Sequence, residues 1–264
     1  MANFTAKDVQ RLRQVSGAGM LDAKKALEET DGDFDEALQY LRVHGQAGAA
    51  KREEREASQG AVTAVRADNA AAVVELRCET DFVAKADEFV ALTDELGALV
   101  AAKGEEAVSE LDDEIDRLRI SLKENISVGQ VRRLVAESGQ VVDTYLHRQA
   151  DRGVNAVAVV IEGGTEELAH DIAVHIAFTK PAYLSRDDVP EADIAAERKT
   201  VEEISRNEGK PEAALPKIVD GRMTGWFKDR VLLDQAYVRD EKQTITGMLG
   251  SARIVAFAQA VIGA

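Results

Sequence analysis

The sequence has 264 residues, 45% of them hydrophobic and 4 of them proline, which is enough for one large domain or about two to three small ones. The formal net charge of −15, with seven acids and no base in residues 105–116, argues against a nucleic-acid partner, because Lys and Arg must neutralise the phosphates in such complexes. The chain has a single cysteine, so no internal disulfide is expected. It has no run of about 18 apolar residues, so no membrane span is expected either. Because residues 1–7 also lack a signal-peptide pattern, the sequence predicts a cytoplasmic protein.

The N-terminal 45 residues predict a module of three short helices. Thr5 and Asp8 have the spacing of a capping box, which opens the first helix. A second helix is expected over residues 20–30, and a third follows it. The residues expected to be buried in the second helix are Met20, Ala23 and Leu27. Residues 46–60 lack a continuous apolar face and predict a linker, part of it helical.

Residues 61–140 predict the first of two core units. Apolar alternation in residues 61–66 and 71–79 indicates a β-hairpin. The helix expected after it has apolar residues three to four positions apart, namely Phe89, Leu92, Leu96, Leu99 and Val100. Two further helices are expected, over residues 115–125 and 128–137.

The same order of hairpin and helix returns in residues 141–190, the second core unit. Strands over residues 141–146 and 154–161 are joined by a polar turn at 147–153 and are followed by a helix over 166–178. Two such units, about eighty residues apart, predict a pseudo-symmetric core of two α+β subdomains.

Residues 191–228 predict an antiparallel helical hairpin that leaves the core. Its helices, expected over 193–207 and 212–227, each have only a narrow apolar stripe, which suits packing of one helix against the other. Such a hairpin could pair two copies of the chain as a dimer, contact a different partner, or do neither. Residues 229–264 are expected to return to the second core unit and to end in a strand over 253–262.

The sequence gives little indication of catalytic chemistry. It contains none of the motifs GxxxxGK[ST], GxGxxG and HExxH. His170 and His175 are five residues apart, about 140° around a helix, so they predict no shared metal site, and His175 alone fits the edge of an apolar helix face. Cys78 falls on the apolar face of its strand, which favours an inert, buried thiol. We therefore expect no catalytic residues, no metal and no cofactor.

The stretch CETDFVAK at residues 78–85 places an acid and a large aromatic between a strand and a helix. The residues alone allow two interpretations. Phe82 and Phe89 have helical spacing, so Phe82 could begin the core stripe of the next helix, with Thr80 or Asp81 as the N-cap. In the other interpretation the Phe82 side chain is exposed for contact with another molecule.

Six stretches, in order along nearly the whole chain, decide how this segment is interpreted. They are LRQVSGAGMLDAKKALEETDGDFDEALQYLR at 12–42, ETDFVAK at 79–85, ENISVGQVRRL at 124–134, DIAVHIAFTKPAYL at 171–184, GKPEAALPKIVDGRMTGWFKD at 209–229 and LLDQAYVRD at 232–240. Together they closely resemble the family of bacterial translation elongation factor Ts, the guanine-nucleotide exchange factor for elongation factor Tu. The resemblance implies a ubiquitin-associated-like three-helix module, a two-subdomain core and a protruding helical hairpin.

The same resemblance implies a function and roles for individual residues. A member of this family binds elongation factor Tu with GDP and promotes exchange of GDP for GTP. The residues implied to form a wedge at the magnesium site of Tu are Thr80, Asp81, Phe82 and Val83, with the aromatic entering between two helices of the Tu nucleotide domain. The residues implied to contact Tu from the N-terminal module are Arg13, Met20 and Leu21. His175 is implied to lie on the core surface that faces Tu.

Two alternatives come from other classes of protein. A protein-binding adaptor would use the ubiquitin-associated-like module, but the chain after residue 60 would then have no purpose. An acidic-site hydrolase would need a base together with a nucleophile or metal ligands in one pocket, and the sequence indicates no such set.

Overall fold

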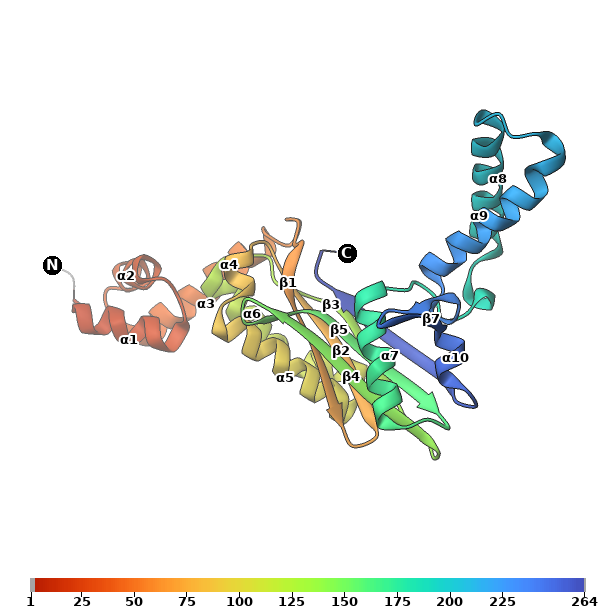
Figure 1. Ribbon diagram of the computed structural model, residues 1–264. Coiled ribbons are helices and arrows are strands. Elements are labelled where there is room, and N and C mark those ends of the chain that lie inside the picture. Colours follow the sequence, from red (N-terminus) through yellow and green to blue (C-terminus); the bar gives the residue numbers. More distant parts are fainter. Residues whose placement is uncertain (1–2, 264) are drawn as a thin grey trace.

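The structure, a computed structural model that describes residues 3–263, has three parts in a row (Figure 1). One end consists of helices α1 (Ala6–Ser16), α2 (Met20–Glu29) and α3 (Phe34–Ala50), and two antiparallel sheets with their covering helices form the middle. The hairpin of α8 (Glu191–Asn207) and α9 (Leu215–Arg230) projects from the other end. The expected α+β class is confirmed. Among the described residues, no helix combines the length and apolarity needed to cross a membrane.

The first three helices pack around a small core of their own. The expected capping box opens α1: the Thr5 hydroxyl oxygen accepts a hydrogen bond from the Asp8 amide at 3.4 Å, and the Asp8 carboxylate accepts one from the Thr5 amide at 2.7 Å. Ala23 and Leu27 are buried, as expected. The expectation for Met20 is wrong, because this residue opens α2 before the buried face begins at Ala23, and it is 49% exposed.

Helix α3 extends into the expected linker and docks the module on the core. It continues to Ala50, so residues 46–50 of the expected linker are helical, in line with the expectation that part of it would be. Its partner is α6 (Asp112–Leu122): a Cβ built on Gly45 would lie 2.8 Å from Ile120 Cγ2, which makes glycine necessary for this close approach. Beyond α3, the Arg52 guanidinium donates a hydrogen bond to the Arg119 carbonyl oxygen at 2.9 Å.

The first sheet contains β1 (Gln59–Ala67), β2 (Ala70–Cys78) and β3 (Ser127–Val135), in the order β1-β2-β3 and antiparallel throughout. The expected hairpin is thereby confirmed. Helix α5 (Asp87–Lys103) covers the outer face of this sheet, and Phe89 is the largest of the side chains that it buries there.

The helix predicted over residues 128–137 is wrong, because this segment forms β3. Val131 lies opposite Val74, and Val128 lies opposite Leu76. The spacing of the apolar residues in this segment also fits a helix. Its β-branched side chains pack against the buried strand β2, and this tertiary contact favours the strand.

The second sheet repeats the arrangement of the first. It contains β4 (Gln140–Gln149), β5 (Arg152–Glu162) and β8 (Arg253–Val261), in the order β4-β5-β8, and α7 (Glu166–Thr179) covers its outer face. The strands and the helix were expected, but the polar turn is shorter than predicted. Only Ala150 and Asp151 connect β4 to β5, and their positive φ angles of 50° and 63° are those of a primed hairpin turn.

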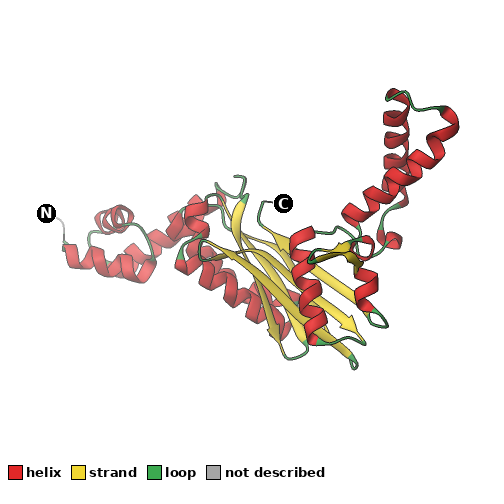
Figure 2. Ribbon diagram, viewed as in Figure 1, coloured by secondary structure: helices red, strands yellow, loops and turns green. Residues whose placement is uncertain are grey.

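The two sheets pack face to face, with α5 outside the first sheet and α7 outside the second (Figure 2). Between them lies an apolar layer to which both sheets contribute, including Val62, Val73, Ala158 and Val160. Strand β2 is therefore buried on both faces. Its C-terminal end pairs with β1 at Gln59 and with β3 at Ser127, so the segment that follows begins from a strand held on both edges.

Strands β5 and β1 approach each other closely where β5 begins. A Cβ built on Gly153 would lie 2.0 Å from the Val62 carbonyl oxygen, so only glycine fits there. Beside it, the buried Arg152 guanidinium donates a hydrogen bond to the Gly60 carbonyl oxygen at 2.6 Å. These contacts tie the start of β5 to the start of β1.

The C-terminal part returns to the second sheet by way of small elements that the sequence did not predict. These are β6 (Ala236–Tyr237), β7 (Asp240–Thr244) and α10 (Ile245–Leu249). Tyr237 and Ile245 pack with the apolar face of α7. The helical hairpin itself was expected, and its narrow stripe includes Val201, Val219 and Met223.

Gly153→Ala is expected to lower the free energy of unfolding by about 1–3 kcal/mol, because the new methyl group forces the two strands apart. Urea denaturation followed by circular dichroism measures the change. The control is Gly221→Ala in α9, where an added Cβ meets nothing within 4 Å, so stability should stay the same or rise by up to about 1 kcal/mol. A Gly153→Ala variant as stable as the original chain would contradict the close approach of β1 and β5.

Candidate partner-binding site

Phe82 lies on α4 (Asp81–Ala84), a single helical turn between the end of β2 and the start of α5. Its side chain is 83% exposed, whereas Ala84 and Phe89, which follow it in the sequence, are buried. The interpretation of Phe82 as the first core residue of the next helix is therefore wrong. The turn presents this aromatic side chain to the solvent.

A carboxylate from a distant part of the chain holds the turn in place. Thr80 is the N-cap of α4, and its hydroxyl oxygen accepts a hydrogen bond from the Val83 amide at 3.4 Å. Glu124 accepts hydrogen bonds from the Glu79 amide at 3.0 Å, the Thr80 amide at 3.1 Å and the Thr80 hydroxyl at 2.5 Å. Hydrogen bonds to a charged acceptor are stronger than neutral ones, so they fix the backbone that carries Phe82.

Asp81 lies in the first turn of α4 but does not cap it. Its carboxylate pairs with the Lys85 ammonium group at 2.5 Å. The hydrogen bond from Lys85 lowers the pKa of Asp81, and the charge of Arg152 acts in the same direction. Asp81 is therefore an anionic, solvent-facing group beside Phe82.

Cys78 lies beneath the same turn and is buried, as expected. Its thiol donates a weak hydrogen bond to the Thr80 carbonyl oxygen at 3.2 Å. Burial, together with the nearby charge of Glu124, raises the pKa of the Cys78 thiol to about 12. The thiol therefore stays protonated at neutral pH and supports the turn without acting as a nucleophile.

His175 is fully buried on α7, although the resemblance implies a place on the surface that faces a partner. Its Nε2 donates a hydrogen bond to Gln235 Oε1 at 2.9 Å, and its Nδ1 accepts one from the Val238 amide at 3.3 Å. Burial lowers the pKa of His175, and the hydrogen bond with Gln235 opposes this only in part. In the free chain His175 joins α7 to the segment around β6, so it reaches a partner only through its neighbours.

The other histidine of α7 points elsewhere, as its spacing predicts. His170 is exposed, and its Nδ1 lies 2.9 Å from Asp143 Oδ2. Over residues 3–263, no group of three or more His, Cys, Asp or Glu side chains comes close enough together to hold a metal ion.

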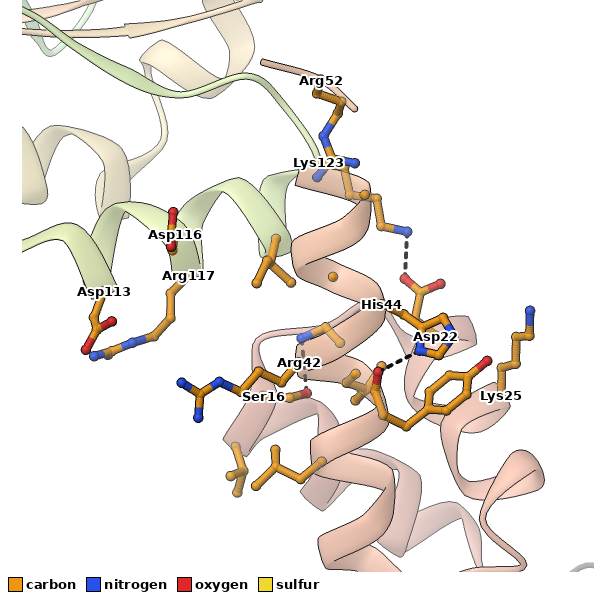
Figure 3. Close-up of a pocket in the computed structure, with 18 residues that line it drawn as sticks. Ser16, Asp22, Lys25, Arg42, His44, Arg52, Asp113, Asp116, Arg117 and Lys123 are labelled. Atoms are coloured by element: carbon orange, nitrogen blue, oxygen red, sulfur yellow. Dashed lines mark hydrogen bonds and ion pairs between the residues drawn. The ribbon is translucent and has the colours of Figure 1, made fainter. Parts of the chain in front are cut away.

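The three-helix module exposes all three residues that the resemblance implies for it: Arg13, Met20 and Leu21, the last of them 81% exposed. A cavity of about 600 Å³ lies between this module and α6 (Figure 3). At its edge, Lys123 Nζ and Asp22 Oδ2 form an ion pair of 2.6 Å. The module therefore contacts α6 on one side of a cavity, through the close approach at Gly45 and the ion pair of Asp22 with Lys123.

The structure draws attention to two residues of the core units, Glu124 and Phe178, to which the sequence analysis gave no role. Glu124 is more than forty residues from the turn that it holds, and only the folded β2–β3 pairing brings the two together. Phe178, in the last turn of α7, is 73% exposed. Helical spacing did contain a signal for Phe178, since it lies outside the stripe of Leu168, Ile172 and Ile176.

Glu124→Ala is expected to destabilise the chain by about 1–3 kcal/mol, because the Glu79 and Thr80 amides lose a charged acceptor. Hydrogen exchange at these two amides should accelerate by at least about tenfold, and urea denaturation should report the loss of stability. Glu110→Ala is the matched control, since Glu110 forms an exposed ion pair with Lys103 and its loss should cost about 0–1 kcal/mol. Unchanged exchange at Glu79 and Thr80 would show that Glu124 does not hold the turn.

His175→Gln is expected to reduce the loss of stability in mild acid. The folded-state pKa of His175 lies below its ordinary value of about 6.5, so the unfolded chain takes up the proton first. The stability that neutral His175 contributes to the folded chain is therefore fully present above about pH 6.5 and is lost as the pH falls through the folded-state pKa. Urea denaturation over this pH range measures the slope. His147→Gln, which changes an exposed side chain, should keep the original slope, and an identical slope in both variants would refute this account.

Comparison with known proteins relates the whole chain to one family. The family model described as Elongation factor TS matches residues 79–264, which include α4, β3, the whole second sheet and the helical hairpin. A relative named Elongation factor Ts from Clavibacter michiganensis subsp. michiganensis is 47% identical over 100% of both chains, and one from Micrococcus luteus is 42% identical over 100% of both. Another, from Mycobacterium tuberculosis, is 46% identical over 96% of this chain and 95% of that protein. The chain therefore belongs to the elongation factor Ts family.

Proposed function

We propose that the chain binds elongation factor Tu in its GDP form and promotes the release of GDP, so that GTP can replace it. The observation that carries this proposal is the exposure of Phe82 on a turn that Glu124 holds in place. A side chain that must enter a partner needs such a fixed support, because a mobile one would lose conformational entropy on binding. Membership of a translation elongation factor family supports the choice of Tu as the partner.

The proposed mechanism works through linkage between two binding events. Backbone donors and a magnesium ion that bridges phosphate oxygens are the usual means of holding a guanine nucleotide. A factor that binds empty Tu better than GDP-bound Tu weakens GDP binding by the same ratio. Phe82 would favour the empty form by entering beside the magnesium site. Thr80, not Asp81, caps α4, so the Asp81 carboxylate would compete for a donor near that site by giving up its ion pair with Lys85.

The size of the effect requires contacts besides Phe82. A change of about 10⁴ in a two-state equilibrium needs about 5.5 kcal/mol of differential binding. Burial of one phenylalanine supplies about 1.5–3 kcal/mol. We therefore assign part of the remainder to Arg13, Met20 and Leu21 on the three-helix module, all of which are exposed. His175 contributes by holding the Gln235 and Val238 segment in position.

The proposed activity involves no making or breaking of covalent bonds by this chain. Acceleration would come only from the preference of the factor for one state of its partner, which makes it an exchange factor and not an enzyme in the chemical sense. No cofactor takes part in the proposal. The place of action would be the cytoplasm, where translation elongation occurs.

Phe82→Ala should slow the stimulated release of labelled GDP from Tu by at least about tenfold, because the wedge is lost. Stopped-flow fluorescence with a fluorescent GDP analogue measures the rate. The melting temperature should not fall, since the Phe82 side chain makes little contact with its own chain.

The matched control is Val135→Ala, which trims an exposed apolar side chain at the opposite end of the first sheet. Its stimulation of GDP release should equal that of the original chain. Full stimulation by Phe82→Ala would exclude the wedge role, and a chain that neither binds Tu nor accelerates GDP release would exclude the proposed function.

A further inference from the structure

Phe178 is the second strongly exposed aromatic side chain among the described residues of the two core units. It lies in the last turn of α7, on the helix face that carries Asp171 and Val174, opposite the buried face of Ile172 and Ile176. Apart from Phe82, no other phenylalanine in residues 3–263 is among the exposed large hydrophobic residues. Phe178 is 73% exposed, so the described part of the chain leaves most of this residue open to solvent.

The end of α7 that carries Phe178 is fixed by side chains from other elements. The Asn155 amide donates a hydrogen bond to the Ala177 carbonyl oxygen at 2.7 Å, and the Gln259 amide donates one to the Ile176 carbonyl oxygen at 3.2 Å. Thr179 donates bifurcated hydrogen bonds to the His175 carbonyl oxygen and to Gln235 Oε1, both at 2.9 Å. The bond from Asn155 satisfies the Ala177 carbonyl group, one of those that a helix end leaves without a helical partner, and the other bonds tie the last turn to neighbouring elements.

Phe178 and Phe82 lie at the same end of the sandwich. Phe82 follows β2, and Cys78 at the end of β2 pairs with Gln59 at the start of β1. The start of β1 is tied to Arg152, and Asn155, which holds the end of α7, is three residues further along β5. At about 3.3 Å per residue, these two supports are about 10 Å apart. Figure 1 shows α4 and the upper end of α7 along the same edge of the molecule.

We propose that Phe178 is a second aromatic anchor of the partner interface and contacts the same protein as Phe82. The inference rests on the proposed function, which supplies the partner, and it extends the interface from the first core unit to the second. Two aromatic side chains, each on a turn fixed by distant hydrogen bonds, form a preorganised pair of contacts, and aromatic residues are enriched among those that dominate binding energy. An aromatic contact from each core unit would also supply part of the differential binding energy that Phe82 alone does not provide.

A crosslinking experiment tests the contact directly. Phe178 is replaced in the full chain by the photoreactive residue p-benzoylphenylalanine, and the protein is irradiated with nucleotide-free Tu. A covalent adduct with Tu is expected from position 178. The same replacement at Val135, at the opposite end of the first sheet, should give none.

Calorimetric titration of nucleotide-free Tu measures what the contact contributes. Phe178→Ala should weaken binding by about 5- to 50-fold at an unchanged melting temperature, and Val135→Ala should bind as the original chain does. Phe178→Tyr, which keeps the ring, should restore most of the affinity.

The outcomes separate the inference from the proposed function. If Phe82→Ala weakens binding while Phe178→Ala does not, and position 178 gives no adduct, the second anchor is wrong and the proposed function stands. If the original chain does not bind Tu, the proposed function fails and the anchor fails with it. An adduct from position 178 together with weaker binding by Phe178→Ala supports both.

Discussion

The start of β5 is held against the start of β1 by the buried hydrogen bond from Arg152 to the Gly60 carbonyl oxygen and by the close approach that only Gly153 permits. This contact fixes one end of the two-sheet sandwich. Cys78, at the end of β2, pairs with Gln59 at the same place, so the turn that carries Phe82 starts from a fixed point. The two core units thus meet close to the turn that carries Phe82.

Near that contact, two exposed phenylalanines lie on turns whose backbone is held by hydrogen bonds from distant residues. Glu124 supports the turn of Phe82 with charge-assisted hydrogen bonds, and the amide side chains of Asn155 and Gln259 support the turn of Phe178 with neutral ones. The three-helix module differs, because a cavity and the Asp22–Lys123 ion pair lie between it and α6. Hydrogen bonds from distant residues therefore hold the candidate surface of the central part, whereas the module adjoins a cavity.

Local signals in the sequence were enough to predict much of the fold, and long-range contacts account for what they missed. The capping box of Thr5 and Asp8, the two hairpins and the covering helices follow from spacing and turn chemistry within a few residues. The strand at 127–135 was mistaken for a helix because its conformation depends on pairing with β2, more than fifty residues away. At the site, ETDFVAK indicated Phe82, but the support by Glu124, the burial of His175 and the exposure of Phe178 all depend on contacts between distant segments.

The proposed mechanism requires that Phe82 favour nucleotide-free Tu over GDP-bound Tu, and the ratio of the two dissociation constants measures this preference most directly. Titration calorimetry gives the dissociation constant of the chain for nucleotide-free Tu and for GDP-bound Tu, first with the original chain and then with Phe82→Ala. The account predicts that the preference for the nucleotide-free form falls by at least about tenfold in the variant. If both constants change by the same factor, so that the ratio is unchanged, Phe82 is only a binding contact and the proposed mechanism is wrong.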